Sequence, residues 1–193
     1  MKANNKSNYI IKRYLSPKRS YNMSPIRRLV ITQSLFALKK EHFDSSFKYV
    51  DIKRVTELSE GCFKDSHLEQ ITLPRSLALL GVKCFKNCKH LKEIVLPRTL
   101  TVIPASCFEG SGLKTIKLPY GIKELRELSF AHTKMTSIFL PKTVEYIAPD
   151  AFKGSMVKSI YCTKKVYGQL QQVTFDMKPD IVIYKKMFSK QVH

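Results

Sequence analysis

The hydrophobic residues of this chain recur in a phrase of 22 or 23 residues, and several apolar columns keep their register from copy to copy. Leucine precedes proline at the end of a short apolar run in four copies, at Pro74, Pro97, Pro119 and Pro141. Phenylalanine recurs at Phe63, Phe85, Phe108, Phe130 and Phe152, and isoleucine at Ile71, Ile94, Ile116, Ile138 and Ile160. A repeat of about 20 to 29 residues with this leucine pattern predicts a stacked solenoid.

Each part of the phrase has a physical interpretation. The short run I-x-L alternates apolar and polar positions, which is the spacing of a β-strand with one buried face. Proline cannot donate a hydrogen bond to a strand ladder, so Leu-Pro marks the corner where that strand ends. An L-x-x-I pair then begins the next face, and a small residue before phenylalanine fills the far corner. One copy has too little apolar surface to bury alone, so neighbouring copies complete a shared core.

The full phrase, I-x-L-P-x-x-L-x-x-I-x-x-x-(C/A/S)-F-x-x-(C/S/T)-x-x-L, resembles the BspA-like leucine-rich repeats of bacterial surface proteins and of some parasitic protists. The resemblance covers about residues 47–163 and is specific, because both Leu-Pro and Phe recur at the right offsets. It implies a leucine-rich-repeat solenoid of about five repeats, an α/β fold made mainly of short parallel strands and turns. It also implies a role in holding other macromolecules, without indicating which.

The amino-terminal region departs from the repeat. Residues 1–24 are rich in Lys, Arg, Asn and Ser, a composition typical of a disordered basic arm. Ser24 followed by Pro25 favours a helix start. Residues 25–46 are therefore predicted to form an amino-terminal cap, with a helix reaching about Lys40. An extra degenerate repeat is the alternative.

The carboxy-terminal region, residues 164–193, is predicted to form a second cap followed by a short basic tail. Thr163 is a good N-cap for a helix from Lys164 to about Phe175. Lys178-Pro179-Asp180 then predicts a turn, and residues 181–184 predict a final strand.

Charge and hydropathy narrow the class of protein. The formal net charge is +19, from 34 basic and 15 acidic residues, and the first 40 positions contain no acidic residue. No apolar run of 18 residues is present, so no membrane-spanning helix is predicted. The amino terminus lacks the apolar stretch of a signal peptide, unlike the secreted bacterial members of the family. We therefore expect an intracellular protein, cytoplasmic or nuclear, with an organelle-targeting role for residues 1–24 as an alternative.

Four of the five cysteines occupy two repeat columns, in which other copies carry serine, threonine or alanine. That exchange indicates small buried fillers with reduced thiols rather than disulfides or metal ligands. His67 and His90 share one column, so their rings are expected to approach across about 4.8 Å between rungs. Exposed turn histidines are the simpler interpretation, and no metal or cofactor is predicted.

No catalytic constellation is visible in the sequence. A phosphate-binding G-x-x-x-x-G-K-[ST] motif is missing, and acidic residues are never paired in one repeat column. The chain is therefore predicted not to be an enzyme, and its function is expected to reside in its surface.

Two repeat columns are predicted to form a partner-binding surface. The outward positions of the I-x-L strands include apolar residues where solvent is expected, a pattern that often marks a protein contact. The position after each proline is basic in three of four copies, which predicts a positive ridge. The candidate residues are Thr72, Val95, Lys117, Phe139 and Tyr161 on the strands, and Arg75, Arg98, Tyr120 and Lys142 on the ridge.

Two functions follow from these features. The first is a non-enzymatic scaffold that presents the sheet face and the ridge to an acidic protein partner. The second is a binder of nucleic acid, of a ribonucleoprotein or of an anionic surface, acting through the basic arm. The arm residues for that role are Lys12, Arg13, Lys18, Arg19, Arg27 and Arg28. Ser16 and Ser24 precede proline and are candidate phosphorylation sites that would lower the charge of the arm.

Overall fold

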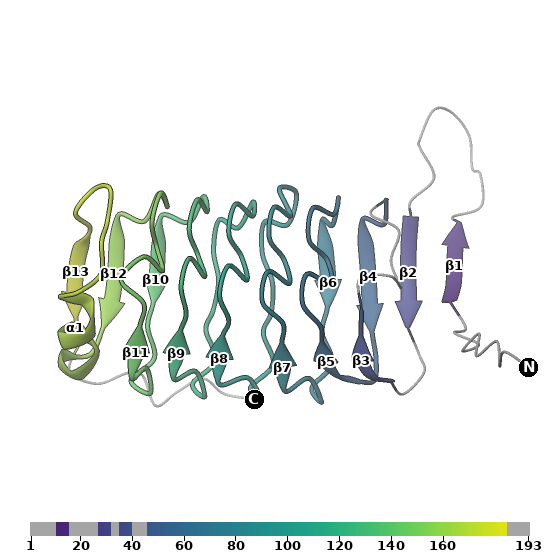
Figure 1. The fold of residues 1–193 in the computed structure, drawn as a ribbon, viewed down its shortest axis with the longest axis horizontal. Helices are drawn as coiled ribbons and strands as arrows, with labels where there is room; N and C mark the ends of the chain where they lie inside the picture. The colour runs from purple at the N-terminus through teal and green to yellow at the C-terminus, as the bar shows by residue number, and fades with distance from the viewer. Residues whose placement is uncertain (1–10, 16–26, 32–34, 40–45, 185–193) are drawn as a thin grey trace, which may run out of the picture.

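The chain forms a row of short stacked coils, which Figure 1 shows along its long axis. The structure is a computed structural model, and it describes residues 11–15, 27–31, 35–39 and 46–184. The strands lie in two rows along the long axis, and the chain passes from one row to the other within each coil (Figure 1). This arrangement confirms the predicted leucine-rich-repeat solenoid.

The first row is a parallel ladder that continues through most of the coils. Its strands are β2 (Arg27–Ile31), β4 (Tyr49–Ile52), β6 (Gln70–Thr72), β10 (Ser137–Phe139), β12 (Ser159–Cys162) and β13 (Asp180–Ile183). Between β6 and β10, the ladder continues as single bridges from Val95 to Lys117 and from Lys117 to Phe139. One further strand, β1 (Ile11–Leu15), pairs antiparallel with β2.

The second row is made of shorter strands. They are β3 (Leu35–Leu38), β5 (Val55–Leu58), β7 (Leu79–Leu80), β8 (Val102–Ile103), β9 (Glu124–Leu125) and β11 (Tyr146–Ile147). All of their pairings are parallel, for example Ile103 opposite Leu125 and Ile147 opposite Leu125. The single α-helix of the described residues, α1 (Lys164–Leu170), closes the last coil.

The Leu-Pro step makes the corner between the two rows. The carbonyl oxygens of Pro74, Pro97, Pro119 and Pro141 each accept a hydrogen bond from the backbone N–H three residues later, at N···O distances of 3.1 to 3.3 Å. These are β-turns. Proline is suited to this position because its backbone nitrogen, which carries no hydrogen, does not have to donate a hydrogen bond to a neighbouring strand. The L-x-x-I residues that follow point into the core, so Leu100 and Ile103 are fully buried.

The phenylalanine column forms the spine of the core. Adjacent rings from Phe63 to Phe152 stack with centroids 5.4 to 5.8 Å apart and planes within 10° of parallel. A sixth ring, Phe175, continues the stack on Phe152 at 5.9 Å. The predicted column is thus confirmed, and it reaches one coil further than predicted.

The predicted amino-terminal helix is wrong. Residues 27–31 and 35–38 form β2 and β3, which pair in parallel with β4 and β5. Leu29 and Ile31 are buried on either side of the half-buried Val30, which is the two-residue period of a strand. The segment is therefore a degenerate repeat, because the parallel neighbour β4 supplies the hydrogen bonds and core contacts that an isolated segment lacks.

The predicted disordered arm is contradicted at Ile11–Leu15, which form β1 against β2. The other residues of the segment 1–24 lie outside the described part of the chain. The edge of β2 explains this difference: an unpaired ladder offers backbone partners that composition alone does not reveal.

The carboxy-terminal cap follows the prediction with shifted bounds. The side-chain hydroxyl of Thr163 accepts a hydrogen bond from the backbone N–H of Val166 and caps α1, which ends at Leu170 rather than near Phe175. The final strand begins one residue earlier than predicted, at Asp180. Phe175 leaves the helix because its ring belongs to the phenylalanine stack, where it contacts Phe152.

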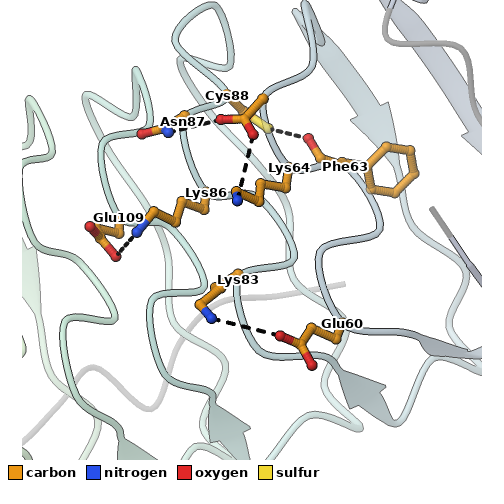
Figure 2. Close-up of polar contacts among 9 residues, drawn as sticks. Glu60, Phe63, Lys64, Lys83, Lys86, Asn87, Cys88 and Glu109 are labelled. Atoms are coloured by element: carbon orange, nitrogen blue, oxygen red, sulfur yellow. Dashed lines mark hydrogen bonds and ion pairs between the residues drawn. The ribbon is translucent and has the colours of Figure 1, made fainter.

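Tight turns connect the strands of successive coils, and polar contacts link neighbouring coils between Glu60 and Glu109 (Figure 2). Lys86 and Glu109 form an ion pair of 2.7 Å between Nζ and Oε2, and Asn87 donates from Nδ2 to Oδ1 of Asp65 at 2.8 Å (Figure 2). Asn87 and Asp65 both have a positive φ, near 60°. Asn and Asp are among the residues that tolerate this left-handed conformation. The chain can therefore make the same sharp turn in each of these coils without a glycine in every copy.

The cysteines lie inside the coils as predicted, and all five are buried free thiols. Cys88 donates from Sγ to the carbonyl oxygen of Phe63 at 3.0 Å, which ties two coils together (Figure 2). Burial raises the pKa of the Cys88 thiol to about 11 and the pKa values of Cys62, Cys84 and Cys107 well above their usual range.

We therefore expect the native protein to resist thiol modification. At pH 8, a chromogenic disulfide reagent should label none of the five thiols within minutes, and all five after denaturation. Because the folded pKa of Cys88 lies above its unfolded value, its contribution to stability is complete below about pH 8.5 and is lost as pH rises toward 11. A thiol that reacts within minutes in the folded protein would contradict this assignment.

Candidate protein-interaction surface

The outward side of the first row of strands carries most of the predicted partner-binding residues. Val95, Lys117, Phe139 and Tyr161 follow one another in a single line, which we call the central column, and Thr72 is an exposed residue of β6 in the same row of strands. The bridges and strand pairs place Lys117 between Val95 and Phe139, and Phe139 beside Tyr161. Val95 is 83% exposed, and Phe139 is half-buried. The structure therefore brings Val95, Lys117, Phe139 and Tyr161 together on one face.

Aromatic rings gather at the carboxy-terminal end of this column. Phe139 stacks with Tyr161 at 6.5 Å between centroids and, more closely, with Tyr184 at 4.8 Å. The Tyr184 hydroxyl donates to the carbonyl oxygen of Leu140 at 3.0 Å. Burial, with smaller contributions from Cys162 and Tyr120, raises the pKa of Tyr184 to about 12. Sequence reasoning missed Tyr184, because it reaches this cluster across two coils rather than through a repeat column.

The residues predicted to form a ridge after the prolines lie at the turns between the two rows of strands. Arg75, Arg98, Tyr120 and Lys142 are all exposed, and we call them the corner column. In three of the four copies the next residue ties the turn to the preceding coil through its hydroxyl. Thr143 donates to the carbonyl oxygen of Ile122 at 2.8 Å, Ser76 donates to Val55 at 2.9 Å, and Thr99 donates to Leu77. These hydrogen bonds hold the turn against the preceding coil, and the side chains of Arg98 and Lys142 are exposed to solvent.

A second line of basic residues borders the other edge of the strands, and sequence reasoning missed it. Lys92, Lys114 and Lys158 are exposed, and each lies three residues before a residue of the central column; we call them the strand-start column. Their register is set by backbone hydrogen bonds such as Lys114 N–H to Lys92 C=O at 2.9 Å. The same 22-residue alignment that revealed the corner column would have found it, one position before the outward strand residues.

The resulting face is positive and largely uncompensated. None of the six basic residues in the two flanking columns forms an ion pair with an acidic side chain in residues 46–184. Of the acidic residues on this face, Glu69 pairs with Lys48 at 2.7 Å and Asp51 with Lys53 at 2.8 Å. The hydrogen bond from Lys48 holds the pKa of Glu69 below its usual range. Glu93 and Asp180 are the exposed acidic residues that remain.

The basic arm is only partly described. Lys12 and Arg13 belong to β1, and Arg27 and Arg28 belong to β2. Lys18 and Arg19, and the candidate phosphorylation sites Ser16 and Ser24, lie outside the described residues.

The two column-related histidines do stack, with ring centroids 5.9 Å apart and planes 18° from parallel. They border a shallow cavity of about 250 Å³ together with Asp65, Ser66, Asn87 and Lys89. Within the described residues, no group of three or more His, Cys, Asp or Glu side chains is arranged to hold a metal ion.

Comparison with known proteins agrees with the repeat geometry. The model of the BspA-type leucine-rich repeat region matches residues 16–133 and 56–182, with six copies in all. The chain belongs to this family. The match extends beyond residues 47–163 at both ends, consistent with β2, β3 and the last coil being degenerate repeats. Proteins built from leucine-rich repeats generally act as scaffolds for protein interactions.

The chain is also similar to two solved structures. A leucine-rich repeat protein from Bacteroides ovatus is 20% identical with a TM-score of 0.47, over 74% of this chain and 45% of that chain. A leucine rich cell surface protein from Faecalibacterium prausnitzii is 16% identical with a TM-score of 0.34, over 83% of this chain and 60% of that chain. This chain therefore spans only about half of each of these proteins. No curated protein matches it.

No helix in the described part of the chain has the length and apolar character needed to cross a membrane.

Proposed function

We propose that this leucine-rich-repeat solenoid is a non-enzymatic scaffold that binds an acidic protein through the outward face of its first row of strands. The observation that carries the proposal is the pair of basic columns, Arg75/Arg98/Lys142 and Lys92/Lys114/Lys158, on either side of the central column. Six exposed cations flank a strip that also contains Lys117. Complementary charge of this kind steers a partner and sets its orientation.

The central column would supply the apolar part of the contact. Val95 and the rings of Phe139 and Tyr161 give this strip exposed hydrophobic surface between the two basic columns. Aromatic anchors with a polar surround are typical of protein interfaces. We infer that the partner combines carboxylates with aromatic or aliphatic side chains, and that it contacts both basic columns at once.

Binding should be tested with a labelled acidic copolymer of glutamate and tyrosine, with polyglutamate for comparison. We expect saturable binding that weakens as salt is raised, because exposed charges are screened beyond roughly 10 Å at 0.1 M salt. Replacing Arg75, Arg98, Lys142, Lys92, Lys114 and Lys158 with glutamate should weaken binding at least about tenfold, a loss of about 1.4 kcal/mol. Fluorescence anisotropy measures both effects.

A matched control keeps the net charge of the variant while leaving the two columns intact. Lys89, Lys123, Lys134, Lys153, Lys164 and Lys165 are exposed, lie outside both columns and form no ion pair within the described residues. Their replacement with glutamate gives the same change in charge. This control should retain binding to within about threefold. Equal losses in the two variants would reduce the contact to net charge and overturn the proposal. Tighter binding of a single-stranded oligothymidine than of the copolymer would favour a nucleic-acid partner instead.

A further inference from the structure

The carboxy-terminal end of the solenoid leaves core positions uncovered. Ile183 lies in register with Cys162 of β12. Cys162 is 0% exposed, whereas Ile183 is 46% exposed. Ile181, in register with the fully buried Ile160, is only half-buried, and so is Phe175 at the end of the ring stack. These side chains occupy the same inward positions as the buried residues of the preceding coil, but no further coil covers them within the described residues.

The backbone of β13 is open at the same end. The N–H group of Asp180 donates to the carbonyl oxygen of Lys158, directly before β12, and that of Tyr184 donates to the carbonyl oxygen of Cys162 in β12. Because N–H groups alternate between the two edges of a strand, those of Ile181 and Ile183 point to the opposite edge. No strand pairs with that edge in the described part of the chain. At the other end of the solenoid, β1 covers the edge of β2 as an antiparallel strand.

We propose that a second copy of this chain covers this end by pairing its own β13 antiparallel with β13, about a two-fold axis at Val182. In this register, Ile181 faces Ile183 of the partner subunit. Both residues direct their backbone groups to the open edge, so each such pair exchanges two hydrogen bonds. Both side chains also lie on the core side of the sheet, so the pairing buries the exposed isoleucines against each other.

The sequence of β13 suits this symmetry. A shift by one residue would place core-facing side chains opposite solvent-facing ones, so it would leave the isoleucines exposed. Asp180, the charged residue of the strand, falls opposite Tyr184 of the partner subunit and not opposite its own copy. The Tyr184 ring folds back over β12 onto Phe139, so it does not cover the open edge.

A two-fold contact also gives a closed assembly with a fixed number of subunits. Pairing of one end with the other end of the next copy would generate an open filament, whereas pairing of β13 with itself stops at two subunits. The dimer would place two sheet faces side by side, each with its basic columns. This inference does not depend on the identity of any acidic partner.

Cross-linking and sedimentation test the dimer. Purified full-length protein at tens of micromolar is expected to sediment at twice the 22.3 kDa mass of one chain. Val182→Cys should form an intermolecular disulfide with copper phenanthroline and air, because non-hydrogen-bonded antiparallel partners have Cα atoms about 4.5 Å apart, within disulfide reach. The native thiols are buried and should not contribute.

Two controls make the result specific. Val95→Cys is more exposed than Val182 and lies on the same face, but it should not cross-link. Ile183→Lys should give a monomer, whereas Leu79→Lys, at an exposed leucine of β7, should leave the dimer intact. A wild-type protein that stays monomeric, or cross-linking of Val95→Cys as fast as Val182→Cys, would overturn the proposal. The cysteine comparison stands even if Ile183→Lys fails to fold.

Discussion

Replacing Phe108 with alanine is expected to lower the free energy of unfolding by about 3–5 kcal/mol, one of the two largest effects predicted for this protein. The Phe108 side chain is fully buried and stacks on Phe85 at 5.4 Å and on Phe130 at 5.5 Å. Truncation would open a cavity in the middle of the ring stack and remove both aromatic contacts. Because each coil is stabilised mainly by its neighbours, the break should weaken coupling between the two halves of the solenoid.

The ring at the end of the stack provides the matched comparison. Phe175 is half-buried and stacks on one ring, Phe152, so Phe175→Ala should cost about 1–2 kcal/mol. Urea unfolding followed by far-UV circular dichroism measures both variants, since the chain has no tryptophan for fluorescence. If Phe108→Ala lowers the free energy of unfolding by no more than Phe175→Ala does, the ring stack is not a main source of stability.

Replacing Gly112 with alanine is expected to destabilise the fold by about 3 kcal/mol or more, because the added methyl group has no room. A Cβ atom at Gly112 would lie 2.1 Å from the carbonyl oxygen of Lys89 and 2.8 Å from its carbonyl carbon. These are backbone atoms of the preceding coil, to which Gly112 is also tied by its N–H bond to Cys88 C=O at 3.0 Å. A flexible side chain could move aside, but a neighbouring coil cannot move without losing its own ladder.

Gly168 provides the opposite case with the same substitution. A Cβ atom there would meet nothing within 4 Å, and the residue is exposed in α1. Gly168→Ala should therefore stabilise the protein by about 0.5–1 kcal/mol through helix propensity. Melting of the two variants, compared with the wild type, shows whether the coils touch at Gly112; a neutral Gly112→Ala would exclude that close approach.

The buried residues of the repeat could be predicted from the sequence because the same packing constraint acts on every copy. Phe85 and Phe108 must fill equivalent places in equivalent coils, so the same residue type returns at a constant interval. The Leu-Pro corner was predictable for the same reason, since Pro97 and Pro119 make the same turn. Cys84 and Cys107 were recognisable as fillers because Ser129 and Ala151 replace them in other copies.

The structure of the two ends was harder to predict from the sequence because it depends on contacts with neighbouring strands and side chains. The apolar spacing around Leu29 and Ile31 is compatible with a loose helix, and the parallel pairing with β4 decides in favour of a strand. Tyr184 lies outside any repeat column, and its place on Phe139 follows from the way the last coil folds back. The strand-start column at Lys92 was within reach of the alignment, but only the structure shows that it and Arg98 border one face.

The sequence by itself determined the coil: its length, its inward residues and its corners, because those are local consequences of a repeated apolar pattern and of proline at a turn. Within the described residues, only the tertiary structure decided which strand edge lacks a partner and which exposed side chains gather on one surface. Those properties depend on contacts between residues far apart in the chain. Ile183 illustrates the difference, since it has the character of a core residue and is exposed only because no coil follows it in the described structure.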